Sequence, residues 1–457
     1  MKKEPENIQE RYDYGKYMLE KTPHESHAAW DSDKRIGNPV ELIEEQNVGR
    51  VHWLVPERRE RMSKSAFTFF RGAARIMAWD LSLTPCTGME TQLCGDAHLS
   101  NFGVYASPER RLVFDLNDFD ETLPGPWEWD VKRLATSLFI AGRHNDLDKK
   151  ACRKIARRCA STYRKAMSKF AEMRLTDIWY TIFEVDELLE LAEDKKYYRQ
   201  QKRLIQKAKK KDSRHALDRL AEYKGGKYRI KSDPPFLVPA RDLADHASQE
   251  ELQEWVINSF DQYKHNISDE LAHLLDKFKI VDFAFKVVGV GSVGTRCAIL
   301  LLQGSDENDP LFLQIKQANQ SVLEEHLPKS QYSNSRERVV QGQRLMQAVS
   351  DLFLGWNECK KTGNHYYWRQ LKDWKGSADV EDVNKSKLKQ MATLRGWNLA
   401  RAHARTGDAV ALSSYLESGN TFPHAIAEFA SRYNDQNEKD YQEYLTEIQE
   451  GRLVGAT

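Results

Sequence analysis

The stretch LCGDAHLSNFGVYASPERRLVFDLNDFDETLPGPWEWDVKRLATSL, residues 93–138, decides the fold of this chain. It begins with the pattern G-D-x-H-x-x-N, in which Asp96 and Asn101 lie five residues apart. Residues 111–114 form an apolar, β-favouring run after a turn-like segment and therefore predict a strand. The strand is expected to lead into Asn117-Asp118-Phe119-Asp120. Carboxylates beside apolar residues are costly to bury unless they are paired, hydrogen-bonded or bound to a metal, so the stretch predicts a polar site.

These residue types suit phosphoryl transfer. Magnesium is a hard cation that prefers oxygen ligands, and Asn101 and Asp118 would hold it against the phosphates of ATP. Asp96 would orient the attacking hydroxyl group and accept its proton. Asp115 and Asp120 are further metal candidates, because alternate residues of a strand face the same side.

The stretch resembles the catalytic loop and metal site of the protein-kinase-like superfamily, especially its aminoglycoside and choline kinase branch. In that branch the loop reads H-G-D-x-H-x-x-N, and the metal-binding aspartate lies in a D-F-x element. Here Cys94 replaces the first histidine, and Asp120 occupies the third position of the D-F-x element. His98 is expected to be a structural hydrogen-bonding group. The resemblance implies that Asp130, in the first turn of a helix opened by Pro126, braces the catalytic loop.

A second pattern lies in residues 283–318, where apolar runs flank Gly289-Val290-Gly291-Ser292-Val293-Gly294. A Rossmann turn would need a helix directly after these glycines, but residues 295–302 form a β-like run. A third apolar run, residues 311–315, ends at a lysine. This order is typical of the kinase lobe that covers the phosphates, although the segment alone would also fit a glycine-rich hairpin. The residues expected to bind the nucleotide are Gly289, Gly291, Ser292, Gly294 and Lys316.

The two patterns occur in the reverse of the usual kinase order. Residues 394–404, LRGWNLARAHA, resemble the helix that immediately precedes the catalytic loop in small-molecule kinases. The parts therefore fit a circular permutation cut between this helix and the catalytic loop, which is tolerable where termini lie close together. The acidic partner of the lysine stays open among three residues. These are Glu324, Glu325 and Glu337.

The sequence as a whole, from about Gly49 to its end, resembles a bacterial family filed as domain of unknown function 2252 and grouped with the kinase-like superfamily. The resemblance implies an α+β, two-lobed protein-kinase-like fold, circularly permuted, with a helical insertion. The expected units are an N-terminal extension packing on the core (1–93), the catalytic-loop half of the large lobe (94–175), a mostly helical basic insertion (176–280), a small β-rich nucleotide-binding lobe (281–378) and C-terminal helices completing the large lobe (379–457).

Composition sets further limits. The 69 basic and 68 acidic residues leave a net charge near +1, so the whole chain gives no argument for a nucleic-acid or membrane partner. The basic run at residues 195–231 is interpreted as a solvated helical face, and Arg71 as part of a structural salt bridge rather than a phosphate contact. The start has no apolar leader, and the six cysteines show no C-x-x-C pair. A cytoplasmic location is expected.

Two other functions remain as alternatives. Gly95-Asp96-Ala97-His98 also matches a metal motif of metallophosphoesterases, and Gly363-Asn364-His365 mimics another, but the other motifs of that class are missing. A pseudokinase-like nucleotide-binding or scaffold protein is the non-enzyme alternative, favoured by Cys94 and by the permuted order. The expected partners of the enzyme are a nucleotide and an unidentified small-molecule hydroxyl acceptor, with a protein acceptor as the weaker choice.

Overall fold

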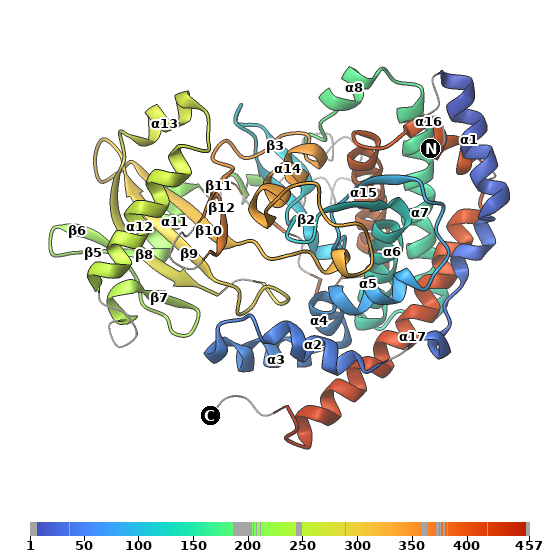
Figure 1. The fold of residues 1–457 in the computed structure, drawn as a ribbon, viewed down its shortest axis with the longest axis horizontal. Coiled ribbons are helices and arrows are strands. Elements are labelled where there is room, and N and C mark those ends of the chain that lie inside the picture. Colours follow the sequence, from blue (N-terminus) through green and yellow to red (C-terminus); the bar gives the residue numbers. More distant parts are fainter. Residues whose placement is uncertain are drawn as a thin grey trace.

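The computed structural model describes residues 7–35, 37–185, 203, 205–206, 208–210, 212–243, 249–287, 289–358, 363–371, 374, 376–377, 380–381, 383–417 and 419–453. It has a β-rich part, built on a six-stranded sheet, and a helical part. Figure 1 shows the two parts side by side, with the sheet at the left and the long helices at the right. The chain is therefore an α+β protein, as the sequence indicated.

The six-stranded sheet has the order β11-β12-β10-β9-β8-β7, and each strand is antiparallel to its neighbours. Its central strand, β9, is apolar along nearly its whole length because both faces of the sheet are covered. Leu300 and Leu302 pack under α12, whereas Ile299 and Leu301 pack under α11 on the other face. The bounds are β7 (Leu237–Pro239), β8 (Lys279–Lys286), β9 (Cys297–Gln303), β10 (Pro310–Gln317), β11 (Gly355–Glu358), β12 (His365–Gln370), α11 (Ser213–Leu220), α12 (Gln249–Lys264) and α13 (Asp269–Leu275).

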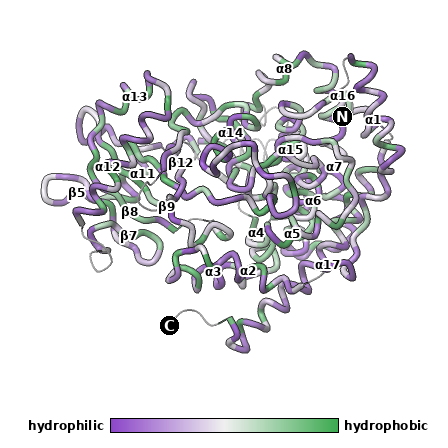
Figure 2. Tube along the Cα trace, viewed as in Figure 1, coloured by the Kyte–Doolittle hydropathy of each residue, from purple (hydrophilic) through white to green (hydrophobic). Residues whose placement is uncertain are grey.

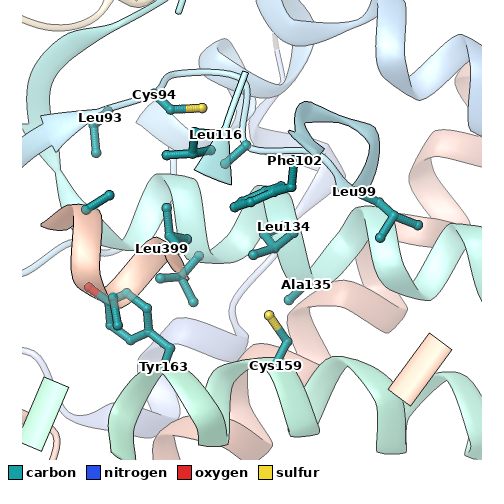
Figure 3. Packing of buried hydrophobic residues seen from close by; sticks show 14 of the residues in the cluster. Leu93, Cys94, Leu99, Phe102, Leu116, Leu134, Ala135, Cys159, Tyr163 and Leu399 are labelled. Carbon is teal, nitrogen blue, oxygen red and sulfur yellow. The ribbon is translucent and has the colours of Figure 1, made fainter. Parts of the chain in front are cut away.

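The helical part is built around α6 (Trp127–His144), which is buried from Trp127 to Gly142. Pro126 precedes its first turn, a position where a missing N–H costs nothing. Helices α7 (Lys149–Ala171), α15 (Lys385–Ala404) and α17 (Thr421–Gln449) pack around it. Figure 3 shows Leu134 and Ala135 of α6 among Cys159 and Tyr163 of α7 and Leu399 of α15. In Figure 2 the outer helices α1 and α17 carry both hydrophilic and hydrophobic residues, as expected of helices with one buried face.

The N-terminal extension packs on this helical part. Helix α1 (Ile8–Lys21) lies against α16 (Ala409–Tyr415), and a Cβ atom at Gly15 would lie 2.2 Å from the Ala411 carbonyl oxygen. Four short helices follow and meet α17 and the loop between β8 and β9. They are α2 (Pro39–Asn47), α3 (Val55–Ser63), α4 (Ala66–Gly72) and α5 (Ala74–Ser82).

The stretch at residues 93–138 lies between the two parts. Strand β1 (Glu90–Leu93) pairs with β4 (Leu123–Pro126), and β2 (Phe102–Ala106) pairs with β3 (Leu112–Leu116) and β13 (Gly376–Ser377). The predicted strand at residues 111–114 is thus confirmed as β3.

Two segments differ from expectation. The apolar spacing of residues 337–353 predicts a helix over that range, but helix α14 (Ser335–Met346) ends earlier. Gln347 is extended (φ −74°, ψ 139°), and the Ala348 N–H donates to Asp115 Oδ2 instead of to a helical carbonyl oxygen. The segment 176–280 contains α8 (Leu175–Tyr180) but also the hairpin β5 (Ala221–Lys224) and β6 (Lys227–Ile230), and β7 joins the main sheet. The hairpin turns at Gly225-Gly226, both with positive φ. Residues 186–202, with part of the basic run, lie outside the described residues.

Among the helices of the described residues, none has the length and apolar character needed to cross a bilayer.

Candidate active site

A buried lysine and two aspartates form the centre of the candidate site. Lys316 of β10 has a side chain only 2% exposed, and its Nζ lies 3.2 Å from each carboxylate oxygen of Asp118. The same Nζ also pairs with Asp120, whose other oxygen accepts a hydrogen bond of 2.8 Å from the Tyr367 hydroxyl. Burial alone would lower the pKa of Lys316, but Asp118 and Asp120 together raise it well above its usual value. The lysine is therefore a fixed cation.

The expected glutamate partners of Lys316 belong to other groups, so that part of the prediction is wrong. Glu324 lies 3.6 Å from Arg338, Glu325 pairs with Arg75 at 2.9 Å, and Glu337 lies in the first turn of α14. The aspartates that pair with Lys316 follow β3, far from β10 in the sequence. No local pattern around Lys316 could therefore identify them.

Asn101 ties the catalytic loop, residues 94–101, to the segment that carries Asp118. Its Nδ2 donates to the carbonyl oxygens of Asp96 at 3.1 Å and Asp118 at 2.9 Å. Its Oδ1 accepts from the Asp118 N–H at 2.7 Å. An amide oxygen has two lone pairs, so Oδ1 keeps one for a further ligand.

Asp96 faces a buried arginine. Its Oδ1 accepts from Arg133 Nε at 2.6 Å, and Arg133 is itself held by the Phe70 carbonyl oxygen at 3.0 Å and stacks 4.2 Å from the Phe70 ring centre. The other oxygen, Oδ2, lies 3.8 Å from His98 Nε2. The Asp96 side chain is 24% exposed, so one carboxylate oxygen is fixed by Arg133 while the group stays accessible.

His98 has the structural role that was expected of it. Its Nδ1 accepts from the Ser100 N–H at 3.1 Å and so caps a short 3₁₀ turn. Burial lowers the pKa of His98 to about 4; Arg71 and Arg133 also lower it, against the attraction of Asp96. The ring is therefore neutral at pH 7.

The start of the catalytic loop is braced from two helices. Asp130 of α6 accepts from the Cys94 N–H at 2.7 Å and the Gly95 N–H at 3.1 Å, which is the contact that the resemblance implied. His403 of α15 lies 3.4 Å from the same carboxylate. Gly95 has φ of +80°, and a Cβ atom there would lie 2.2 Å from the Glu121 carbonyl oxygen, so only glycine fits. Figure 3 shows the Cys94 side chain beside Leu93 and Leu116.

The glycine loop, residues 289–294, packs against the N-terminal extension. The Gly294 carbonyl oxygen accepts from the Val51 N–H at 2.7 Å, and the Gly289 carbonyl oxygen accepts from Arg61 at 2.6 Å. Gly289 and Gly294 have φ of +72° and +88°. A Cβ atom at Gly291 would lie 3.2 Å from the Arg71 carbonyl oxygen. Ser292 closes the turn by accepting from Thr295 at 3.1 Å.

Asp115, a reserve metal candidate, is buried elsewhere, so that expectation is wrong. It accepts from Arg401 of α15 at 2.5 Å and from the Ala348 N–H at 3.0 Å. Strand alternation turns Asp115 toward α15 and α14 rather than toward Lys316. Of the two reserve candidates, only Asp120 lies in the site.

The expected salt bridge of Arg71 is also wrong. Among the described residues its guanidinium has no hydrogen-bond or ion-pair partner, and its Nε is buried. Arg50 and Arg133 were missed altogether. The sequence signal that could have found all three is weak: Arg50 and Arg71 lie outside the motifs, and Arg133, although it lies in the stretch 93–138, has no role in them.

Glu121 gives the site a testable pH dependence. Burial raises the pKa of Glu121 to about 7, against the Val322 N–H and Arg338, while Asp120 and Asp96 raise it further. The pKa of an unfolded glutamate is about 4.3. Between these two pKa values the folded protein binds more protons than the unfolded chain. The free energy of unfolding therefore falls as the pH rises through this range.

We therefore expect Glu121→Gln to gain stability over the wild type by about 1–3 kcal/mol at pH 8 and by nearly nothing at pH 4. The amide oxygen of the variant can still accept from the Val322 N–H, which lies 2.8 Å from Glu121 Oε2. Urea unfolding of both proteins at the two pH values measures the difference. An equal difference at both values would contradict the prediction.

The end of α15 meets the start of β1. The Gln92 N–H donates to Thr406 Oγ1 at 3.1 Å, across 314 residues of sequence. A Cβ atom at Gly407 would lie 3.2 Å from the Glu90 carbonyl oxygen. The helix LARAHA and the catalytic loop are thus neighbours in space.

Comparison with known families gives one result. A family model described as "Uncharacterized protein conserved in bacteria (DUF2252)" matches residues 50–447. Neither the curated proteins nor the solved structures provide a match.

Proposed function

The chain belongs to this bacterial family, and on that premise we propose that it is an ATP- and magnesium-dependent phosphotransferase with a circularly permuted kinase-like fold. Its acceptor is a small-molecule hydroxyl, as in the aminoglycoside and choline kinase branch that the motifs resemble. The observation that carries the proposal is the pairing of Lys316 with Asp118 at 3.2 Å, with Asn101 linking Asp118 to Asp96.

Two features of the chain path support the permuted fold. The glycine loop and Lys316 belong to neighbouring strands of one antiparallel sheet, as in the kinase lobe that covers phosphates. The hydrogen bond between Gln92 and Thr406 lies where the proposed cut separates LARAHA from the catalytic loop. In an unpermuted kinase the helix that corresponds to LARAHA would continue into the catalytic loop, so the segments that carry these two residues would be joined in the chain.

The residues have distinct tasks in this proposal. Lys316 exchanges part of its pairing with the aspartates for the phosphates of ATP. Asp96 orients the acceptor hydroxyl and takes its proton on Oδ2, because Arg133 holds Oδ1. Asp130 fixes the loop that carries Asp96.

The donor set fits a magnesium ion. Asp118 has a side chain 42% exposed, and Asn101 keeps one lone pair on Oδ1, so both offer hard oxygen atoms. In the described part of the chain no three His, Cys, Asp or Glu side chains group as a metal site. Magnesium is usually held by one or two carboxylates, with waters and substrate phosphates as its other ligands. When bound, it would neutralise charge on the phosphates.

A second candidate is a nucleotide-binding protein without turnover. It is favoured by the ion pair between Asp96 and Arg133, which already neutralises the proposed base in a site where the arginine is 3% exposed. Turnover measurements separate the two candidates, because both bind nucleotide.

The first test is nucleotide binding. We expect ATP with magnesium to stabilise the wild-type protein, by about 2.7 kcal/mol when the ligand is at 100 times its dissociation constant. Lys316→Ala should lose most of this stabilisation, because it removes the cation that contacts the phosphates. Differential scanning calorimetry with ATP, with and without magnesium, measures both effects. If millimolar ATP, GTP, CTP and UTP all leave the melting temperature unchanged, the proposal fails.

A further inference from the structure

Two arginines of the N-terminal extension flank the glycine loop and have no carboxylate partner among the residues that the structure describes. Arg71 closes α4, and Arg50 lies between α2 and α3. Neighbouring arginines are paired: Arg59 with Glu44, Arg61 with Glu57 and Arg75 with Glu45. Among the described residues, neither Arg50 nor Arg71 forms an ion pair. Arg58 forms none there either, but its guanidinium donates to Asn47 Oδ1 at 2.8 Å and to the Gly72 carbonyl oxygen at 3.3 Å, whereas Arg71 has no hydrogen-bond partner in the described part of the chain.

Arg71 lies between the glycine loop and the catalytic loop. Its carbonyl oxygen is 3.2 Å from the position of a Cβ atom on Gly291. Arg71 lies near enough to residues 96–98 for its charge to lower the pKa of His98 and for the charge of Asp96 to raise the pKa of Arg71. Burial lowers the pKa of Arg71, and its Nε has no partner in the described part of the chain.

Arg50 lies at the other end of the glycine loop. Its Nη1 donates to the Val293 carbonyl oxygen at 2.6 Å, and its aliphatic stem fills the space where a Cβ atom on Gly294 would lie, 2.9 Å from Arg50 Cβ. Burial, and the nearby charge of Arg58, lower the pKa of Arg50 to about 9, while Glu121 and Asp120 act in the opposite direction.

Arg50 and Arg71 are both partly buried, and a buried N–H donor without a partner, such as Arg71 Nε, is costly. The cost is offset when an anion binds, and arginine is well suited to phosphate because it presents two parallel N–H donors. Arg71 has no hydrogen-bond partner in the described part of the chain, and its backbone packs against Gly291 of the glycine loop. Arg50 already gives one donor to the loop and adds positive charge.

We infer that Arg71, assisted by Arg50, binds the terminal phosphates of a polyphosphate ligand between the glycine loop and the catalytic loop. The N-terminal extension is thus part of the binding site, and its helices pack against the glycine loop. That the phosphates belong to a nucleotide rests on the proposed function. The anion site itself stands on the two arginines.

The test uses inorganic triphosphate, which carries the phosphates without a nucleoside. We expect isothermal titration calorimetry to detect binding to the full-length wild-type protein, and Arg71→Ala to weaken it about 10- to 100-fold, the range of one charge-assisted hydrogen-bonding group. Arg50→Ala should weaken binding less. Arg75→Ala is the matched control, since Arg75 lies one turn further along, is paired with Glu45 and Glu325, and should leave affinity unchanged.

Stability without ligand separates a binding role from a structural one. Because Arg71 has no partner among the described residues, Arg71→Ala should melt at the same temperature as the wild type or higher, and Arg71→Lys should keep part of the affinity. If Arg71→Ala binds triphosphate as tightly as the wild type, or the wild type does not bind millimolar triphosphate, the inference is overturned.

Failure of this inference differs from failure of the proposed function. Stabilisation by ATP that survives Arg71→Ala would overturn the role of Arg71 and leave the phosphotransferase proposal standing. Arg71-dependent binding of triphosphate, without transfer of phosphate from ATP to any acceptor, would support the anion site and count against the phosphotransferase.

Discussion

Asp96→Asn is expected to lower phosphotransfer by roughly two to four powers of ten while nucleotide binding stays near the wild-type level. The asparagine keeps the shape of the side chain but cannot take the proton of the acceptor hydroxyl. It also weakens the contact with Arg133 Nε, which is 2.6 Å in the wild type. Turnover measured as ADP release across a panel of small hydroxyl compounds, with ATP affinity measured separately, tests the prediction.

Asp115→Asn is the matched control for this experiment. Asp115 also pairs with a buried arginine, Arg401 at 2.5 Å, but it points away from Lys316. It therefore suffers a similar loss of an ion pair without touching the proposed chemistry. At a temperature where both variants are folded, Asp115→Asn should keep its turnover. Full activity in Asp96→Asn, with the true acceptor, would mean that Asp96 is not the base.

Asp118→Ala is expected to have the second large effect. The variant loses the proposed metal ligand and one of the two carboxylates paired with Lys316. Metal ions stabilise the transferring phosphates by several kcal/mol, so turnover should fall by roughly a thousandfold or more. The affinity for ATP should also become insensitive to magnesium. Titration of the wild type and the variant with ATP, with and without magnesium, measures this loss of magnesium dependence.

Asp120→Asn shows which aspartate carries the metal. Asp120 pairs with Lys316 and accepts from Tyr367 at 2.8 Å, so its loss should disturb the lysine but preserve the magnesium dependence of ATP binding. Burial, with the nearby charge of Asp118, raises the pKa of Asp120. If Asp120→Asn abolishes the magnesium dependence and Asp118→Ala does not, the two roles are exchanged.

The parts of the fold that could be predicted from sequence are those with strong local signals. The apolar run of β9 and the alternation around Lys316 depend on neighbouring residues, and Pro126 marks the start of α6. The contact of Asp130 with residues 94–95 was implied by the resemblance to the kinase-like superfamily and not by a local pattern, since 36 residues separate Asp130 from Cys94. Local reasoning did give the structural hydrogen-bonding role of His98.

The rest depends on contacts between segments that are distant in the sequence. No local pattern distinguishes Asp115, which meets Arg401, from Asp120, which meets Lys316. Arg71 resembles the paired arginines near it in the sequence, but the fold gives it no ion-pair partner among the described residues. The early end of α14 likewise depends on hydrogen bonds to β3.

The contact between Gln92 and Thr406 also sets the order in which the protein can fold during synthesis. The ribosome releases β1, the catalytic loop, α6 and α7 long before α15 and α17, which supply the other side of the same core. Until those helices emerge, Asp130 lacks His403, and the apolar faces of α6 and α7 face solvent or a chaperone. A nascent chain stalled before residue 385 therefore lacks both α15 and α17, and completion of the helical part follows translation of residues 385–457, about the last sixth of the chain.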